Sequence, residues 1–345
     1  MADKHIVFVT NVASFYKIEL IKRLSKYFKT TLVLIGRTDQ VILDENNVDL
    51  GFNIIKLSDD DTDNKIKGIL RSFKLINILK RLSYDYIVYT GWDNLEFNIG
   101  CCFTSKRKNC IICESSIFES RTNGIKGFIK RAIVNRFSIA FPSGEPHLRL
   151  LQALGFKGKT LVTGGVGIIE KLDNEKIYDG NKTIKYLFIG RLIKIKNIEL
   201  LIRVFNKLNK PLTIVGTGPE EEYLKNIANS NVSFKGFINR EMIKNIYRNN
   251  DCLILPSLKE TWGLVVEEAI ASGLPVLASK MVGSSEDLIL KYKRGLTFDP
   301  LNSSSLEQAI SDFESNFKFY FNNVKTFDSE KHKTLYLDCF KRAFE

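Results

Sequence analysis

The chain is poor in residues that build common metal and membrane sites: among 345 residues there are three histidines, six cysteines and no apolar run near 20 residues long. A membrane-spanning helix needs about 20 consecutive apolar residues, so no such helix is expected. No G-x-G-x-x-G pattern follows the first predicted strand, so a dinucleotide is not expected there. The start, MADKHIVFVT, enters that strand without a signal-peptide pattern, and we expect a cytosolic protein.

The cysteines include one close pair, Cys110 and Cys113. No second C-x-x-C and no histidine pair is present to complete a zinc site with them. The pair lies in the apolar segment NCIIC, where free cysteine commonly acts as a small buried hydrophobe. We therefore predict no metal site and reduced thiols, as is usual in the cytosol.

Positive charge is in excess and unevenly distributed. The net charge is +12, and residues 101–160 alone hold 11 Lys and Arg against 3 Asp and Glu. Such a local excess indicates contact with an anionic surface. No nucleic-acid-binding module accompanies it, so a membrane surface is favoured over nucleic acid.

One predicted helix in this basic region, residues 125–137, interleaves apolar and basic residues. That pattern fits a helix lying on an anionic membrane. It equally fits a helix packed on the sheet with a basic outer face, and the sequence leaves both open. The basic residues concerned are Lys126, Lys130, Arg131 and Arg136.

Strand-like and helix-like segments alternate along the whole chain, which predicts α/β architecture with parallel sheets. A chain of this length usually forms two domains. Composition becomes polar and loses periodicity at residues 168–183, the predicted linker. The strands predicted in the first half are residues 5–10, 30–36, 52–57, 84–90, 109–113, 138–144 and 159–164.

The most informative stretch is PSLKETWGLVVEEAIASGLPVLAS, residues 256–279. It predicts a strand end, a loop with Glu260, and a helix that starts near Gly263 and carries Glu268. The first amide groups of a helix lack intrahelical acceptors and favour an anion, best of all a phosphate. Two carboxylates beside such a helix end suit a diphosphate that carries a sugar at each end.

This E-x7-E spacing, followed by Ala-x-x-x-Gly-x-Pro-Val, resembles the signature of glycosyltransferase family 4, retaining enzymes of GT-B fold. The resemblance implies that Glu260 contacts the transferred sugar and that Glu268 holds the nucleotide ribose. It also implies that the amides of Gly263, Leu264 and Val265 bind the diphosphate. Trp262 departs from the family pattern, in which Phe is commoner.

Other segments of the second half are similar to the same family. Gly190-Arg191-Leu-x-x-x-Lys196 matches an element whose two cations neutralise the donor diphosphate, and such cations stabilise a departing diphosphate in the transition state. Gly216 lies in a turn expected near the nucleotide. Phe237 and Ile238 match the place where the family holds the base.

The first half offers weaker candidates for an acceptor site. Glu114 follows a predicted strand, at the edge where parallel sheets bind ligands, and is either an acceptor-side base or a polar loop residue. Asp93 is a second candidate for the same role. Tyr16 and Lys17 take the places of a Pro-Tyr-Arg-like sequence of one family subgroup, with a plain helix start capped by Ser14 as the alternative. The D-x-D spacing within residues 59–63 is better explained as a solvated loop before a helix.

The expected protein therefore has two Rossmann-like domains facing a cleft in a GT-B fold. These are residues 1–167 for the acceptor and 184–324 for the nucleotide sugar, with residues 325–345 as a helix returning to the first domain. The resemblance implies transfer of a hexose-type sugar from a nucleoside diphosphate sugar, with UDP favoured and GDP left open. We expect the acceptor to be a glycan or lipid-linked molecule of cell-envelope polysaccharide synthesis, and no metal or other cofactor is implied.

A GT-B sugar-nucleotide epimerase and a non-catalytic sugar-nucleotide-binding subunit are the alternative functions. The expected location is the cytoplasm, with peripheral attachment to the inner face of the cell membrane left open.

Overall fold

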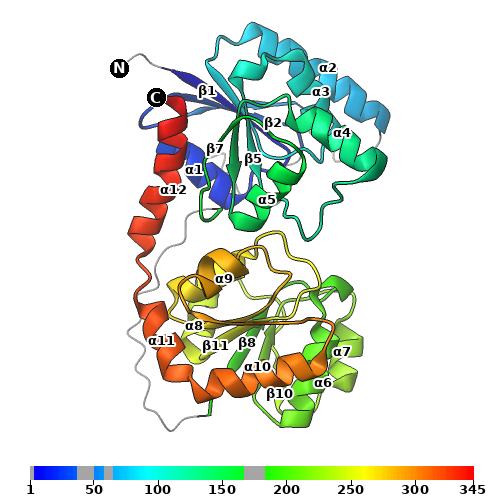
Figure 1. Ribbon diagram of the computed structural model, residues 1–345, viewed down its shortest axis with the longest axis vertical. Helices are drawn as coiled ribbons and strands as arrows, with labels where there is room; N and C mark the ends of the chain where they lie inside the picture. Colours follow the sequence, from blue (N-terminus) through cyan, green and yellow to red (C-terminus); the bar gives the residue numbers. More distant parts are fainter. Residues whose placement is uncertain (1–3, 37–49, 58–64, 167–182) are drawn as a thin grey trace. The chain divides into compact units, whose positions relative to one another are not determined.

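The computed structural model describes residues 4–36, 50–57, 65–166 and 183–345. The chain divides into two compact units, Met1–Ile168 with His332–Glu345, and Ile169–Lys331. Each unit is a parallel sheet covered by helices (Figure 1), which confirms the expected α/β architecture of two Rossmann-like domains. The predicted linker lies outside the described residues except for its last residue, and the loop of residues 59–63 lies wholly outside them.

The first unit is built on a seven-stranded sheet with strand order β3-β2-β1-β4-β5-β6-β7. All its strand pairs are parallel, and β1 is buried along its whole length. Such burial on both faces explains the continuous apolar runs in the sequence. The strands are β1 His5–Thr10, β2 Lys29–Leu34, β3 Asn53–Lys56, β4 Tyr86–Tyr89, β5 Asn109–Cys113, β6 Ile139–Pro142 and β7 Lys159–Thr160.

Helices cover the two faces of this sheet unequally. The described helices before the linker are α1 Phe15–Leu24, α2 Lys65–Arg81, α3 Leu95–Phe103, the short η1 Lys106–Lys108, α4 Gly124–Val134 and α5 Glu145–Ala153. One core cluster gathers residues of α2, α3, α4 and α5 on one face, whereas α1 lies on the other. The face with α1 therefore has room for a further helix.

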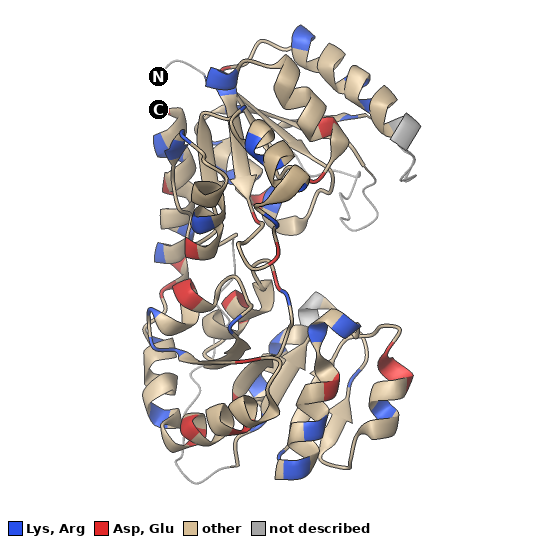
Figure 2. Cartoon of the chain, turned by 45° about the vertical axis from the view of Figure 1, so that its right-hand side comes forward, with Lys and Arg blue, Asp and Glu red and all other residues tan. Residues whose placement is uncertain are grey.

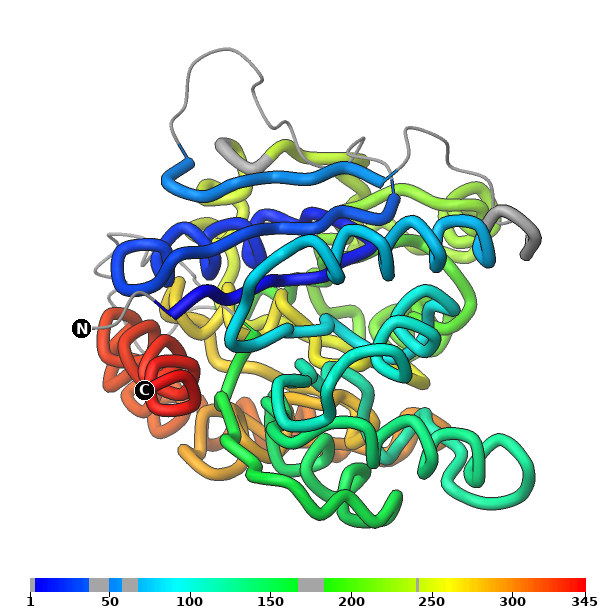
Figure 3. Tube along the Cα trace, turned by 90° about the horizontal axis from the view of Figure 1, so that it is seen from above, coloured from blue at the N-terminus to red at the C-terminus, as the bar shows by residue number. Residues whose placement is uncertain are grey.

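That helix is α12, Ser329–Phe344, which packs beside α1 as the expected returning helix. The Phe340 ring stacks on the Phe141 ring of β6 with centroids 4.2 Å apart, and Phe344 packs edge-on against Phe28. The Lys4 side chain donates a 2.6 Å hydrogen bond to the Phe344 carbonyl. Figure 3 shows the C-terminal helix, in red, beside the N-terminal strand. The C-terminal helix α12 thus completes the hydrophobic core of the first unit.

The second unit has a six-stranded sheet in the order β10-β9-β8-β11-β12-β13, the same winding as the first. Its strands are β8 Tyr186–Ile189, β9 Leu212–Val215, β10 Val232–Phe234, β11 Cys252–Leu255, β12 Val276–Ser279 and β13 Gly295–Phe298. Its described helices are η2 Lys194–Lys196, α6 Ile198–Leu208, α7 Glu221–Ile227, α8 Arg240–Asn249, α9 Leu264–Ala271, the π-helix η3 Ser285–Leu290, α10 Ser303–Ser315 and α11 Phe317–Lys325. In open sheets of this kind, ligands generally bind outside the carboxyl ends of the strands.

Candidate active site

The predicted donor residues all follow strands of the second sheet at their carboxyl ends. Gly190 and Arg191 follow β8, Gly216 follows β9, and Phe237 lies beyond β10. The loop with Glu260 connects β11 to α9. Because parallel strands end at the same edge, the structure gathers at one edge residues from four loops, from Gly190 to Glu260 in the sequence.

Gly190, Gly216 and Gly236 lie where the segments after β8, β9 and β10 form backbone hydrogen bonds. The Gly216 amide donates a 2.8 Å hydrogen bond to the Gly236 carbonyl, and the Gly190 amide donates one of 3.0 Å to Val215. Gly216 has φ +130°, and a Cβ there would lie 1.9 Å from the Gly190 carbonyl oxygen. A side chain at Gly216 would push the β8 loop away, so this position requires glycine.

Lys196 and Glu260 form an ion pair between η2 and the loop after β11. The Ser257 hydroxyl also donates to Oε2 of Glu260, at 3.3 Å. The Leu258 amide, in the same loop as Glu260, donates a 2.9 Å hydrogen bond to the carbonyl of Ile195, which precedes Lys196. This bond fixes the loop after β11 to η2. The structure therefore joins the first predicted carboxylate to one of the two predicted cations, a pairing that the sequence did not indicate.

Helix α9 begins beside this pair. Its N-cap is Gly263, with φ +88°, and a Cβ there would lie 3.3 Å from Cγ of Glu260 and 3.2 Å from Cγ1 of Val282. Leu264 and Val265 occupy the first turn and are half-buried, so their amide groups have no acceptor within the helix. The predicted anion-binding helix end thus lies next to Glu260.

Glu268, in the second turn of α9, is held by a residue that sequence analysis missed. The Tyr247 hydroxyl donates a 2.9 Å hydrogen bond to Oε2 of Glu268. Burial, with Glu268 as the next cause, raises the pKa of Tyr247 well above its ordinary value, so the phenol stays a neutral donor. Tyr247 lies on α8, 21 positions before Glu268, and no local pattern marks it.

Arg191, Phe237 and Ile238 are left accessible to a ligand. Arg191 is exposed and forms no ion pair with the described part of the chain. Phe237 is 79 % exposed, an unusual state for a large aromatic ring, and Ile238 is half-buried. These three residues lie in the loops that follow β8 and β10.

Asn197 links two loops at the same edge. It stands at the N-cap position of α6, with φ +56°, and makes no capping hydrogen bond. Its side-chain amide instead donates to the Pro256 and Pro300 carbonyls, at 3.3 and 2.8 Å. Asn197 thus fixes the end of η2, and with it Lys196, against the β11 loop.

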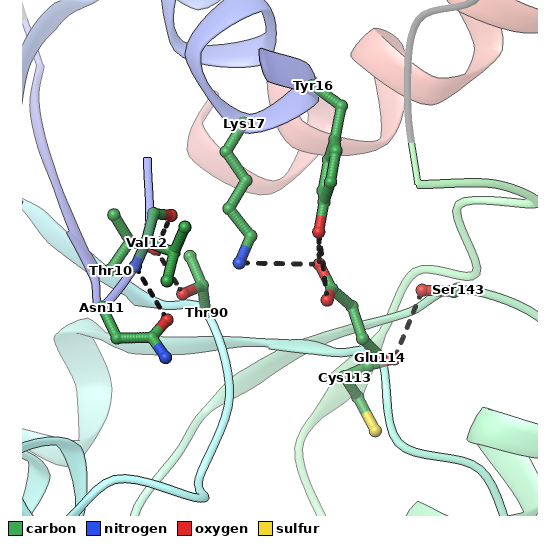
Figure 4. Close-up of polar contacts among 9 residues, drawn as sticks. All are labelled: Thr10, Asn11, Val12, Tyr16, Lys17, Thr90, Cys113, Glu114 and Ser143. Atoms are coloured by element: carbon green, nitrogen blue, oxygen red, sulfur yellow. Dashed lines mark hydrogen bonds and ion pairs between the residues drawn. The ribbon is translucent and has the colours of Figure 1, made fainter. Parts of the chain in front are cut away.

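In the first unit, the carboxyl ends of β1 and β5 bring together Tyr16, Lys17 and Glu114 (Figure 4). The Tyr16 hydroxyl lies 3.4 Å from both carboxylate oxygens of Glu114, and Nζ of Lys17 lies 4.0 Å from Oε1. Burial, then the charge of Glu114, raises the pKa of Tyr16 far above its ordinary value. Ser14 stands at the N-cap of α1 but makes no capping hydrogen bond, so the alternative of a plain capped helix start is not supported.

Asp93, the other acidic candidate, acts electrostatically on Cys113 at the end of β5. Burial raises the pKa of the Cys113 thiol, and the negative charges of Glu114 and Asp93 raise it further. Asp93 itself is exposed, in the loop between β4 and α3. Between β1 and β4, Thr90 donates a 3.0 Å hydrogen bond to Thr10 (Figure 4), which ties the two strand ends together.

Within the described residues, no three His, Cys, Asp or Glu side chains are grouped so that they could hold a metal ion. The six cysteines are free thiols, and Cys110 and Cys113 are buried in β5 as the sequence predicts. No helix in the described part of the chain is both long and apolar enough to cross a bilayer.

Comparison with known proteins agrees with this geometry. Residues 170–323 match the family described as glycosyl transferases group 1. An uncharacterized glycosyltransferase of Methanocaldococcus jannaschii is 34% identical over 171 residues, which is 45% of this chain and 42% of that protein. A GDP-mannose-dependent alpha-mannosyltransferase of Corynebacterium glutamicum is 33% identical over 126 residues, 36% and 30% of the two chains. The chain thus spans less than half the length of these relatives.

Similarity to solved structures extends over both units. The apo form of the lipopolysaccharide outer core galactosyltransferase WaaB has a TM-score of 0.71 with 16% identity, over 98% of each chain. At that identity the likeness establishes the fold alone. The protein therefore has the fold of the GT-B glycosyltransferases. The match to the group 1 glycosyl transferases lies in the second half of the chain and contains every predicted donor residue.

Proposed function

We propose that the protein is a retaining glycosyltransferase that moves a hexose-type sugar from a nucleoside diphosphate sugar to a glycan or lipid-linked acceptor. The observation that carries the proposal is the contact of Lys196, Glu260 and the start of α9 at one sheet edge, inside the region that matches group 1 glycosyl transferases. Cations, a helix N-terminus and a carboxylate together suit a diphosphate bonded to a sugar.

Each group has a chemical task in this proposal. The amides of Leu264 and Val265 bind the diphosphate, with Arg191 and Lys196 as its cations. Glu260 accepts hydrogen bonds from hydroxyls of the transferred sugar. Glu268, oriented by Tyr247, accepts them from the ribose.

The ion pair between Lys196 and Glu260 links the residue proposed to bind the diphosphate of the donor to the residue proposed to bind its sugar. A diphosphate that binds Lys196 competes with Glu260 for the ammonium group, which leaves the carboxylate freer to accept sugar hydroxyls. As the bond between sugar and phosphate breaks, negative charge grows on the leaving oxygen, where fixed cations are most effective. We propose that no divalent metal is needed for this stabilisation.

On the acceptor side, we propose Glu114 as the group that binds the attacking hydroxyl. Tyr16 and Lys17 both contact its carboxylate and so orient it. Retention follows from attack on the face that the diphosphate leaves, with a departing phosphate oxygen taking the acceptor proton. Glu114→Gln is expected to lower kcat while the donor affinity is unchanged, and Asp93→Asn is the comparison variant for the other acidic candidate. A loss confined to Asp93→Asn would move the acceptor role to that residue.

The setting we propose is the synthesis of cell-envelope polysaccharide. It is supported by the likeness of fold to WaaB, whose name places that protein in lipopolysaccharide outer core synthesis. The strongly basic first unit, shown with the other charges in Figure 2, is compatible with an acceptor held at an anionic membrane.

The test is saturation-transfer NMR of the full chain with UDP-, GDP- and ADP-sugars, with and without EDTA, followed by an assay of released nucleoside diphosphate in the presence of candidate acceptors. We expect selective binding of one donor that survives EDTA and is lost in Glu268→Ala, and acceptor-dependent release of diphosphate. Glu222→Gln, an exposed glutamate on α7 of the same unit, is the control. A product that keeps its nucleotide would instead indicate an epimerase, and binding without any turnover a non-catalytic subunit.

A further inference from the structure

Helix α4 has its apolar side chains on the outside. Of its 11 residues only Gly127 and Val134 are buried. Ile125, Phe128 and Ile129 are 81, 73 and 51 % exposed. A helix that covers a sheet normally turns its apolar face inward, so this arrangement is opposite to what packing favours.

The exposed apolar residues form one continuous stripe. Ile125, Phe128, Ile129 and Ala132 recur at three- and four-residue spacing, and all four are exposed. At 3.6 residues per turn they lie on one face of the helix, directed away from the sheet. We call this stripe, together with Lys126 and Arg131, the α4 surface.

The two cations flank the stripe. Lys126 and Arg131 are exposed and fall on opposite sides of it at helical spacing, about 100° from its centre. Lys130 and Arg136 lie elsewhere: Lys130 donates to Ser120 at 3.1 Å, and the Arg136 guanidinium donates to backbone carbonyls at the end of α3. Of the four basic residues expected at a membrane, Lys126 and Arg131 therefore belong to the outward surface, and Arg131, Lys130 and Arg136 each also form a hydrogen bond within the local fold.

The backbone of α4 is held firmly, so this exposure is a property of the folded unit. A Cβ at Gly127 would lie 2.0 Å from the Thr122 carbonyl oxygen, which shows how closely the helix approaches the preceding loop. Arg131 also donates to the Thr122 carbonyl, at 3.3 Å. Val134 joins the core cluster at the other end. The helix is thus anchored at both ends with its apolar stripe facing outward.

We propose that the α4 surface docks the protein on an anionic lipid membrane. Apolar side chains enter the boundary between headgroups and acyl chains, and Lys126 and Arg131 contact anionic headgroups beside them, as in interfacial amphipathic helices. The charge pattern disfavours a second copy of the chain as the occupant. Because α4 holds no acidic residue, two such helices in contact would oppose like charges.

The inference goes beyond the proposed transfer reaction and does not depend on it. Its test is flotation of the full chain with phosphatidylcholine vesicles, with and without about 30% phosphatidylglycerol. We expect binding to the anionic vesicles that falls as NaCl rises from about 0.1 to 0.5 M, because salt screens the cations. Replacing both Lys126 and Arg131 by Gln is expected to weaken binding by about fivefold per charge.

The apolar stripe is tested by Ile125→Ser with Phe128→Ser, for which we expect at least about a tenfold loss of vesicle binding. The matched control is Lys318→Gln with Phe319→Ser, an exposed basic and aromatic pair on α11 of the other unit, which is expected to bind normally. Because Ile125 and Phe128 are exposed, thermal unfolding of the variant is expected to match that of the parent chain.

A spectroscopic variant reports insertion without removing the stripe. Both natural tryptophans, Trp92 and Trp262, are buried, so Phe128→Trp adds the one exposed indole. Its emission is expected to shift to shorter wavelength with anionic vesicles and to be quenched by brominated lipid. Failure of the parent chain to bind anionic vesicles, or binding that ignores the α4 variants, overturns the proposal. A concentration-dependent dimer that Phe128→Ser abolishes would identify a second copy as the occupant and overturn it too.

Discussion

The ammonium group of Lys196 donates to the carboxylate of Glu260, 64 positions later in the chain. The two residues lie in the segments that follow β8 and β11, and the hydrogen bond from the Leu258 amide to the Ile195 carbonyl keeps these segments together. A group proposed to bind phosphate is therefore already paired with a group proposed to bind the sugar.

Replacing Lys196 by Ala is expected to lower kcat/KM for glycosyl transfer by about 10²- to 10³-fold, because one fixed positive charge is lost where the leaving group develops its negative charge. Lys194→Ala is the matched control, since Lys194 lies in the same short helix and is exposed. Steady-state kinetics with the identified donor measures the effect. Equal losses in the two variants would contradict a specific role for Lys196.

Removing the Tyr247 hydroxyl as Tyr247→Phe is expected to weaken nucleotide-sugar binding by about tenfold, because Glu268 loses a hydrogen bond that orients it. Calorimetric titration with the donor gives the affinity. In a background that already carries Glu268→Gln, the substitution is expected to have much less effect on binding. Additive losses in the double variant would show that Tyr247 acts independently of Glu268.

The glycines at the two ends of α9 allow a matched comparison. Gly263→Ala and Gly273→Ala both place a side chain at positive φ, +88° and +77°, which costs about 1–2 kcal/mol of folding stability in each case. A Cβ at Gly263 would also press on the side chains of Glu260 and Val282. A Cβ at Gly273 would meet no other described atom within 4 Å. We expect similar melting temperatures but a loss of donor binding in Gly263→Ala alone. Normal donor binding by that variant would separate the helix start from the donor site.

Phe340→Ala is expected to destabilise the first unit by about 3–5 kcal/mol, because the ring is fully buried and stacks on Phe141. Leu335→Ala on the same helix is the control, since Leu335 is 53 % exposed. Denaturant unfolding followed by circular dichroism compares the two. If Phe340→Ala unfolds like the parent chain, α12 does not contribute to the core of the first unit.

Burial raises the pKa values of the Cys110 and Cys113 thiols from an ordinary 9.0. At pH values at which the two thiols of the unfolded chain begin to ionise, the folded protein therefore keeps them protonated. Their contribution to stability is fully present below about pH 9 and is lost as the pH rises further. At pH 8, iodoacetamide is expected to modify the exposed Cys102 long before either buried thiol, as peptide mass spectrometry would show. Early modification of Cys113 would mean that β5 opens readily.

Much of the fold could be predicted from residue patterns because it depends on local periodicity. Buried parallel strands give apolar runs, and β1 and β5 were predicted with the bounds that the structure has. Helices α3 and α5 were missed. The segment Leu95–Phe103 is apolar around most of its circumference and so shows no clear stripe. Helix α5 begins only three residues after the end of β6, and the predicted strand of residues 138–144 extended up to its first residue.

The sequence by itself determined the two α/β domains, the motif residues from Gly190 to Glu268 and the excess of positive charge in the first half. These depend on composition and on spacing within one element. Only the tertiary structure decided that Lys196 pairs with Glu260, that Tyr247 orients Glu268 and that Tyr16 and Lys17 converge on Glu114. It also decided which side of α4 faces outward. Such contacts join residues that are distant in sequence. They form only when the parallel strands end at a common edge and the helices pack on the sheet.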